Sequence, residues 1–305
     1  METGIKFTKT GVKVYKSLDD NVIIHNKKSD DFQRLLEKCK NLKFYEDFLS
    51  ENSEDALTFS VFHTLNHFVP KDRWLFDFFT CAINNTFAER IKPYLPDAEI
   101  KFWQEYSPPI SYLDYVDECN RRRKPEAIIF HNKSKMQKER YEELFDKVKR
   151  KLKSNNKKWE GDTQVDVEIS IKNRLLVFVE AKLDSDISPD TVYDSTRNQI
   201  IRILDVGVEQ KKEQGYEDFR FILLTSDKST AKSYGKYLLK YRGVEKQDLQ
   251  KWEKAGDTKS IKKALPHRKE PEEFFENLTT SFGWLTWADM FKLSLRYFGD
   301  SVKNR

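Results

Sequence analysis

The sequence predicts an α/β domain whose core carries helical decorations. The strongest strand signal is an alternating segment, Thr163–Ile171, followed by a turn at 172–174 and a β-branched run, Leu175–Lys182. This pattern is typical of a β-hairpin. Helical patterns lie on both sides of the hairpin without a strict alternation of strand and helix. Such a mixture favours one α/β domain.

The composition excludes several classes of protein. The chain has 305 residues, and its longest apolar runs, such as 175–179, are far shorter than the roughly 18 residues of a membrane span. No apolar stretch near the first residue resembles a secretory signal. Three separated cysteines form no CxxC pair, so neither a disulfide framework nor a zinc knuckle is predicted. We therefore expect a cytoplasmic protein with no membrane partner.

In chain order, the pattern divides the chain into three parts. Residues 1–50 form a peripheral segment with a short strand at 11–15 and a helix at 30–40. Residues 51–245 form the core, and residues 246–305 form a helical, aromatic extension that packs on it. Within the core, helices are predicted at 53–68, 74–91, 139–152, 194–210 and 228–240, and strands at 100–106, 126–130, 163–171, 175–182 and 219–225.

Positive charge is concentrated in one stretch of the core. The whole chain has a formal net charge of +5, whereas residues 131–160 alone contain 11 Lys and Arg against 5 Asp and Glu. The run Arg121, Arg122, Arg123 and Lys124 comes just before this stretch. A solvated, partly helical insertion is one interpretation. The other is an electrostatic footprint for a polyanion, and charge alone does not choose between them.

The hairpin brings carboxylates together. If it closes around Asn173, residues whose numbers sum to about 346 lie opposite one another, so Asp166 faces Glu180. Two carboxylates across a strand pair repel each other, so a cation is expected between them. Lys182 supplies one charge, and Mg²⁺, which prefers oxygen ligands, would suit the pair better. The alternative is an exposed polar face on which Lys182 neutralises Glu180.

Strand alternation also predicts which side chains share each face of the hairpin. One face carries the charged residues Asp166, Glu168, Glu180 and Lys182. The other face is apolar and is expected to meet a core; it carries Val165, Val167, Ile169, Val177, Val179 and Ala181.

Two helices add polar side chains to predicted apolar faces. The helix at 53–68 begins after Ser53, a good N-cap, and Glu54 lies within the arc of its apolar stripe. A carboxylate there is costly unless it is paired or bound to a metal, although an acidic first turn also favours the helix dipole. Gln199 and Arg202 are neighbours on an otherwise apolar helix. A phosphate, a metal-bound water or the backbone would provide hydrogen-bond partners for these two side chains.

In combination, these residues resemble the PD-(D/E)XK nuclease superfamily, and they look like its uncharacterised, restriction-endonuclease-like members. The matching motifs span 53–225 and comprise Glu54, Asp166, Glu180-Ala181-Lys182 and Gln199 within Arg197-Asn198-Gln199-Ile200-Ile201-Arg202. Val165, rather than proline, precedes Asp166. A rival acidic residue, Glu126, follows Pro125 but lies 54 residues before Glu180.

The resemblance implies a restriction-endonuclease-like core, in which helices flank a central mixed sheet, and metal-assisted hydrolysis of a phosphodiester. Asp166, Glu180 and the carbonyl of Ala181 would hold Mg²⁺, or Mn²⁺ as a substitute, with Glu54 bound directly or through water. Lys182 would position or activate the attacking water, and Gln199 would orient the site. On this basis, Asp166→Ala or Lys182→Ala is expected to abolish cleavage and leave the fold intact.

The function that the resemblance implies is a Mg²⁺-dependent endonuclease acting on DNA, of restriction, defence or repair type. Arg202 would contact phosphate or hold a carboxylate, and Arg121, Arg122, Arg123 and Lys124 would contact the nucleic acid. A catalytically inactive nucleic-acid-binding module of the same fold is one alternative. A nuclease for RNA or branched DNA is another. A homodimer would pair two active sites to cut two strands.

Overall fold

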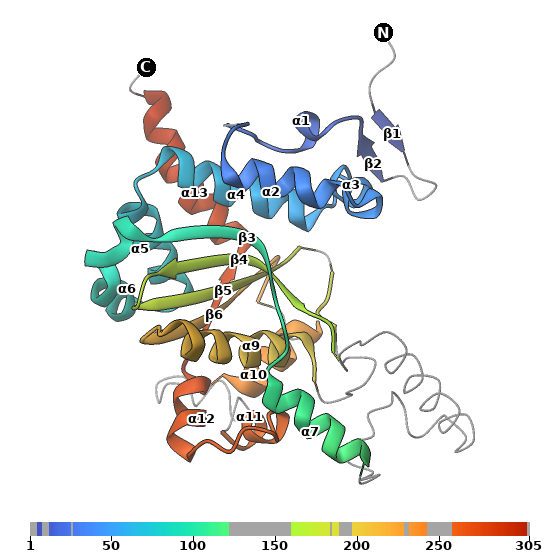
Figure 1. The fold of residues 1–305 in the computed structure, drawn as a ribbon. Coiled ribbons are helices and arrows are strands. Elements are labelled where there is room, and N and C mark those ends of the chain that lie inside the picture. The colour runs from blue at the N-terminus through green and yellow to red at the C-terminus, as the bar shows by residue number, and fades with distance from the viewer. Residues whose placement is uncertain are drawn as a thin grey trace.

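A five-stranded mixed sheet forms the centre of the fold (Figure 1). The computed structural model describes residues 5–7, 12–25, 27–121, 160–183, 185–188, 197–228, 232–242 and 258–303. The strands lie in the order β3 (Glu99–Tyr106), β4 (Thr163–Ile171), β5 (Leu175–Lys182), β6 (Asp218–Thr225) and β7 (Phe282–Thr286). The first three are antiparallel neighbours, and β6 and β7 continue parallel to β5. The α/β class that the sequence predicts is confirmed.

The hairpin of β4 and β5 has the predicted register between Val167 and Ile171, but the predicted pair of Asp166 and Glu180 is not part of the ladder. Val167 lies opposite Val179 and Ile169 opposite Val177, as expected for a turn centred on Asn173. Asn173 adopts a left-handed conformation with φ of 60°, which asparagine tolerates well. Every side chain of β5 is buried, because this central strand is covered on both faces.

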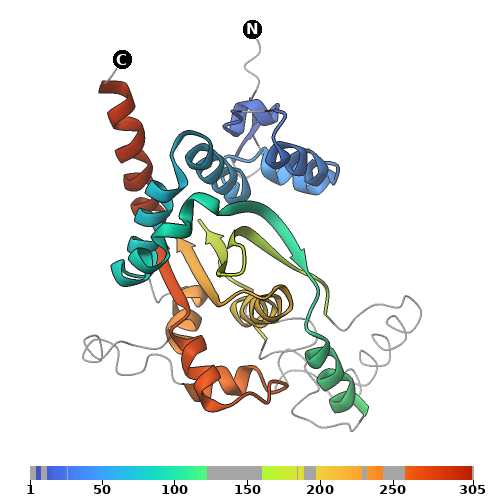
Figure 2. The same cartoon turned by 60° about the vertical axis from the view of Figure 1, so that its left-hand side comes forward.

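Helices cover both faces of the sheet, as Figures 1 and 2 show from two directions. One face is covered by α4 (Glu54–Phe68), α5 (Lys71–Ala82) and α13 (Trp287–Lys303), whose buried aromatic rings share one hydrophobic core with Val177 and Val179. The other face is covered by α9 (Gln199–Gln214), α10 (Ser233–Tyr241), α11 (Thr258–Ala264) and α12 (Glu272–Thr279). Their apolar side chains pack on Leu176 and Phe178.

The N-terminal segment packs outside the first of these helical layers (Figure 1). It contains β1 (Ile5–Phe7), β2 (Lys13–Tyr15), α1 (Leu18–Asn21), α2 (Asp30–Cys39) and α3 (Leu42–Phe48). Phe32, Leu35 and Phe48 join the core beneath α4. The remaining elements are α6 (Asn85–Ile91), the 3-10 helix η1 (Lys92–Asp97) and α7 (Ile110–Arg121).

Three predicted helices have different boundaries, and the one predicted at 228–240 runs from Ser233 to Tyr241. The segment predicted as one helix at 74–91 is two, because the side chain of Asn84 accepts a hydrogen bond from the Phe87 N–H and starts α6. The helix predicted at 194–210 begins at Gln199, where Asn198 is the N-cap and accepts from the Ile201 N–H. It ends at Gln214, and the C-cap residue Gly215 has a left-handed φ of 73°, which is typical of a helix C-terminus.

The C-terminal segment contributes to the sheet itself. The sequence predicts an extension that packs on the core, whereas β7 pairs in parallel with β6 from Phe221–Phe282 to Thr225–Thr286. Trp284 and Trp287 are buried. Thus residues near the C-terminus complete the edge of the central sheet, which local sequence patterns around 283–289 do not reveal.

A buried cluster of charges fixes the start of α9. The Asp205 carboxylate accepts a hydrogen bond from Arg268 Nε at 2.7 Å and lies 2.9 Å from Arg197 Nη1. Arg197 also donates from Nε to Glu160 at 2.6 Å, and its guanidinium lies 3.6 Å from the ring centroid of Tyr112. Burial alone would raise the pKa of Asp205, but the surrounding cations hold it well below its usual range. The cluster therefore ties α7, α9, the start of β4 and the C-terminal segment together.

Some predicted elements lie outside the described residues. These are the strand at 126–130, which includes Glu126, the helix at 139–152 and, except for Glu160, the Lys-rich stretch 131–160. Among the helices that are described, none has the length and apolar character needed to cross a membrane.

The contact between α9 and β6 gives a test of the packing. A Cβ atom built on Gly207 would lie 2.1 Å from the ring of Phe219, which is buried. We expect Gly207→Ala to lower the free energy of unfolding by about 1–3 kcal/mol, because the ring has to move in a filled core. Gly161→Ala is the matched control, since nothing lies within 4 Å of its Cβ position. Urea unfolding followed by circular dichroism measures both, and equal stability of the two variants would contradict this packing.

Candidate active site

A small cavity lies at the end of β5, between the two helical layers. It has a volume of about 190 Å³. Its lining comes from α4, β4, β5 and α9 and consists of Glu54, Asp55, Thr58, Gln164, Asp166, Glu180, Lys182 and Gln199. All five residues predicted to be catalytic are therefore brought to one place from four separate elements.

Glu180 and Lys182 form an ion pair in the wall of the cavity. Lys182 Nζ lies 2.8 Å from Glu180 Oε1, and the two residues are only 9% and 1% exposed. Burial raises the pKa of Glu180, while Lys182 opposes that rise. Burial alone would lower the pKa of Lys182, but the carboxylates of Glu180 and Asp166 raise it above its usual value. Lys182 is therefore held as an ammonium ion at neutral pH.

Gln199 links Glu180 to the loop after β5. Its Nε2 donates to Glu180 Oε1 at 2.5 Å, and its Oε1 accepts from the Ser188 N–H at 3.3 Å. The other oxygen, Glu180 Oε2, is buried and has no hydrogen-bond partner among the described residues. A buried carboxylate oxygen without a donor is costly, so this atom is suited to a cation or a water.

Asp166 lies where the pairing of β4 is interrupted. Its Oδ2 accepts the Ala181 N–H at 2.8 Å, in place of a regular ladder bond. On the other side, β3 pairs through Phe102 and Gln104, while Trp103 between them has an uncommon φ of 50°. Burial and then the nearby charge of Glu180 raise the pKa of Asp166 well above its usual value.

This interruption corrects two predictions about the faces of the hairpin. Val165 was expected to share a face with Val167, but it packs in the core beneath α9, whereas Val167 packs in the core beneath α4. Glu168 was expected to share a face with Asp166. Instead it accepts the hydroxyl of Tyr106 and lies 3.7 Å from Lys101 Nζ, away from the cavity. The irregular backbone opposite Trp103 breaks the strict alternation of side chains.

Glu54 ties α4 to the segment that leaves β5. As the first residue of the helix, it follows Ser53, whose side chain accepts from the Ala56 N–H. Its carboxylate accepts the Leu183 N–H at 2.5 Å and the Ser185 hydroxyl at 2.7 Å. It also lies 3.9 Å from Lys182 Nζ. Glu54 is thus satisfied by main-chain and side-chain donors rather than directed into the apolar stripe of the helix.

Three lining residues were not predicted from the sequence. Asp55 accepts a hydrogen bond from Trp103 Nε1 at 2.8 Å, and burial raises its pKa despite that bond. Thr58 lies one helical turn after Glu54, and Gln164 lies two residues before Asp166 on β4. Periodicity could have suggested these last two, since residues four apart on a helix and two apart on a strand share a side.

The predicted nucleic-acid contacts are placed only in part. Arg202 does not line the cavity; its Nε lies 3.6 Å from Glu160, and its Nη2 donates to the carbonyls of Gly161 and Asp162 at 3.4 Å. Two roles were predicted for Arg202, contact with a phosphate or with a carboxylate, and in the structure it lies beside the carboxylate of Glu160. Arg121 ends α7, and Arg122, Arg123 and Lys124 lie outside the described residues.

The donor atoms of the cavity fit a hard divalent cation that keeps part of its water shell. Within the described part of the chain, no group of three or more His, Cys, Asp or Glu side chains is arranged to hold a metal ion. Mg²⁺, however, is often bound through only one or two carboxylates. Asp166 and Glu180 supply these, Glu180 Oε2 has no donor among the described residues, and a cation would offset the burial and the nearby negative charge that raise both pKa values.

Searches of protein-family models, of curated proteins and of solved structures each found no match for this chain. Membership of a nuclease family thus stays a prediction from the sequence motifs. The chemistry of this site is inferred from its own geometry.

The raised pKa of Asp166 gives a test by stability. An acid whose pKa is higher in the folded state favours folding when it is protonated. Its contribution to stability is therefore lost as the pH rises from its pKa in the unfolded state through its pKa in the folded state. In metal-free buffer, Asp166→Asn should therefore raise the melting temperature at pH 8 by ~2–4 °C, the effect of about 1 kcal/mol in a chain of this size. The gain should shrink at pH 5. A gain that grows as the pH falls would contradict the assignment.

Proposed function

We propose that this protein is a Mg²⁺-dependent endonuclease that hydrolyses phosphodiester bonds of DNA and has a restriction-endonuclease-like core. One observation carries the proposal: Glu54, Asp166, Glu180, Lys182 and Gln199 surround one cavity. The sequence resemblance names the same five residues in the same order along the chain. Their convergence on a cavity from distant elements, with the pKa values of two carboxylates raised, supports a common chemical role, because perturbed carboxylates in a cleft are typical of functional sites.

Asp166 and Glu180 are the residues that would hold the metal, together with the Ala181 carbonyl and with Glu54 directly or through water. Asp166 and Ala181 are already joined by the hydrogen bond from the Ala181 N–H, which fixes their relative position. When bound, Mg²⁺ polarises a phosphoryl oxygen and makes its coordinated water more acidic. The protein contributes a rigid frame, since both carboxylates stand on paired strands in the middle of the sheet.

Lys182 and Gln199 would act on the phosphate and on the carboxylates. The ammonium group of Lys182 can donate hydrogen bonds to the attacking water and offset negative charge that develops on the phosphoryl group. Its high pKa favours these roles over removal of a proton from water. Gln199 holds one oxygen of Glu180 and leaves the other without a donor among the described residues, so it is a positioning residue.

The structure changes the variants that are suitable for a test. Lys182→Ala would leave the buried Glu180 without its cation, and breaking a buried ion pair typically costs about 3–5 kcal/mol. Loss of activity in that variant would then be ambiguous between chemistry and folding. Asp166→Asn and Glu180→Gln preserve side-chain size and remove only the charge. Glu168→Gln is a matched control, because Glu168 is a carboxylate on β4 that is about as buried as Glu180 and does not line the cavity.

The proposal is tested by incubating purified protein with supercoiled plasmid, single-stranded DNA and RNA, each with Mg²⁺, Mn²⁺ or EDTA. We expect metal-dependent nicking of the plasmid that falls about 100-fold or more in Asp166→Asn and Glu180→Gln and is retained in Glu168→Gln. Gel electrophoresis measures the rates, and circular dichroism checks that each variant is folded.

Other outcomes of that assay would decide against the proposal. Binding of DNA without cleavage of any substrate would favour a non-catalytic nucleic-acid-binding module. Cleavage confined to RNA would move the function to another substrate class. Undiminished Mg²⁺-dependent activity in the Asp166→Asn, Glu180→Gln double variant would show that this cavity is not the active site.

A further inference from the structure

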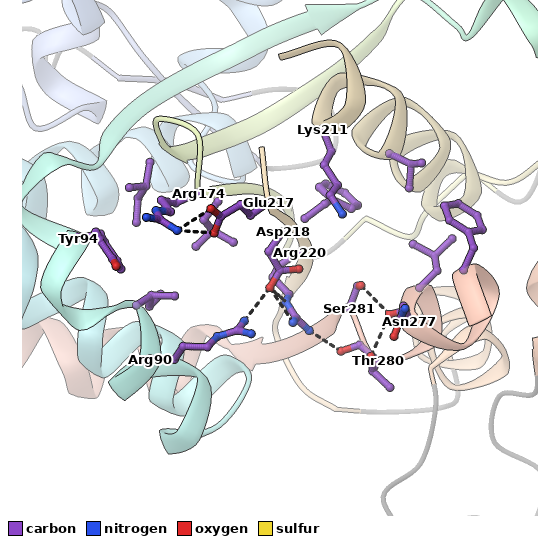
Figure 3. Close-up of a pocket in the computed structure, with 17 residues that line it drawn as sticks. Arg90, Tyr94, Arg174, Lys211, Glu217, Asp218, Arg220, Asn277, Thr280 and Ser281 are labelled. Atoms are coloured by element: carbon purple, nitrogen blue, oxygen red, sulfur yellow. Dashed lines mark hydrogen bonds and ion pairs between the residues drawn. The ribbon is translucent and has the colours of Figure 1, made fainter. Parts of the chain in front are cut away.

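A larger cavity lies at the opposite end of the sheet from the candidate active site. It has a volume of about 520 Å³ and is shown in Figure 3. It is bounded by α6, the turn between β4 and β5, the C-terminal half of α9, the start of β6 and α12. Leu175, at the first position of β5, lines it, whereas Lys182 ends the same strand at the candidate active site. Seven residues of extended strand place these positions ~23 Å apart, so the two cavities are separate.

Positive charge predominates around this cavity. Four cations line it, Arg90, Arg174, Lys211 and Arg220, against the two carboxylates of Glu217 and Asp218. The carboxylates are shared among the arginines: Arg174 Nη1 lies 2.5 Å from Glu217, and Arg90 and Arg220 both reach Asp218 Oδ2. Figure 3 shows these ion pairs as dashed lines. The lining thus keeps an excess of two positive charges.

Donors remain available on these cations. Lys211 is half-buried on the last turns of α9, and no carboxylate pairs with its Nζ among the described residues. Arg174 uses Nη1 for both bonds to Glu217, which leaves donors on Nε and Nη2. A guanidinium group and an ammonium group that line one cavity give it donors suited to the oxygens of a phosphate group.

The rest of the lining is suited to a flat ring. The Tyr94 side chain lies against Arg174, with the guanidinium 5.0 Å from its ring centroid, and is 38% exposed. On the opposite side, α12 contributes Phe274 and Leu278 and α9 contributes Val208. A ligand that only carried a phosphate would leave these apolar walls uncovered. A ligand with both a phosphate and a ring would use the whole cavity.

We propose that this cavity is a second ligand site, which binds a free mononucleotide. Its phosphate would be bound by Lys211, and its base would pack against the apolar side chains that α9 and α12 contribute to the cavity. The volume falls within the roughly 300–1,000 Å³ of small-molecule sites. This site does not depend on the proposed nuclease activity, because it shares no lining residue with the smaller cavity.

Isothermal titration calorimetry of the full chain tests this site. The probes are AMP, GMP, CMP and UMP, each compared with its nucleoside and with inorganic phosphate. We expect at least one monophosphate to bind about tenfold or more tightly than its nucleoside or inorganic phosphate. Lys211→Glu should lower the affinity for that monophosphate by at least a similar factor. Lys212→Glu is the matched control: its side chain is exposed on the same helix and does not line the cavity. Binding should persist in Asp166→Asn.

Four results would overturn the proposal. These are the absence of binding by every monophosphate at millimolar concentration, equal affinity for inorganic phosphate, equal losses in Lys211→Glu and Lys212→Glu, and loss of binding in Asp166→Asn. The last result would place the nucleotide at the candidate active site instead. Because plasmid cleavage is not measured here, failure of this site and failure of the proposed nuclease function are distinguishable.

Discussion

The buried ion pair between Glu180 and Lys182 is the interaction on which the candidate site depends. Both residues stand on β5, whose eight side chains are all buried, so neither charge is solvated by bulk water. Each stabilises the other, and removal of one leaves an uncompensated charge in the sheet. The pair also brings in its neighbours, because Gln199 donates to Glu180 and Glu54 lies close to Lys182.

A second buried charge cluster, around Arg197 and Asp205, holds the start of α9, the helix that carries Gln199. Arg197 lies two residues before Gln199 and is held by Glu160 and Asp205. Arg268, from the C-terminal segment, completes the charge balance around Asp205. The N-terminus of α9 is therefore anchored by contacts to distant parts of the chain, and this anchoring fixes where Gln199 meets Glu180. Removing Asp205 would leave Arg197 with only Glu160, and Arg268 with only Glu209, as carboxylate partners among the described residues.

The two ends of the sheet have opposite chemical character. At one end, carboxylates from α4, β4 and β5 gather around a small cavity. At the other, arginine and lysine side chains surround a larger cavity with apolar walls. The formal net charge of +5 hides this separation, because the opposed groups nearly cancel in the sum. Rigid strands keep the groups apart, so each cavity retains its own field.

The sequence by itself determined the hairpin register, the helix carrying Glu54, and the set of five residues at the candidate site. The register and the helix follow from neighbours two to four positions apart, which fix local periodicity and helix starts, whereas the set of five follows from the resemblance of its motifs to a nuclease superfamily. Only the tertiary structure decided the irregular pairing at Trp103, the bond from Trp103 to Asp55, and the addition of β7 to the sheet. Such features depend on contacts between segments far apart in the chain, and packing selects them where local preference is weak.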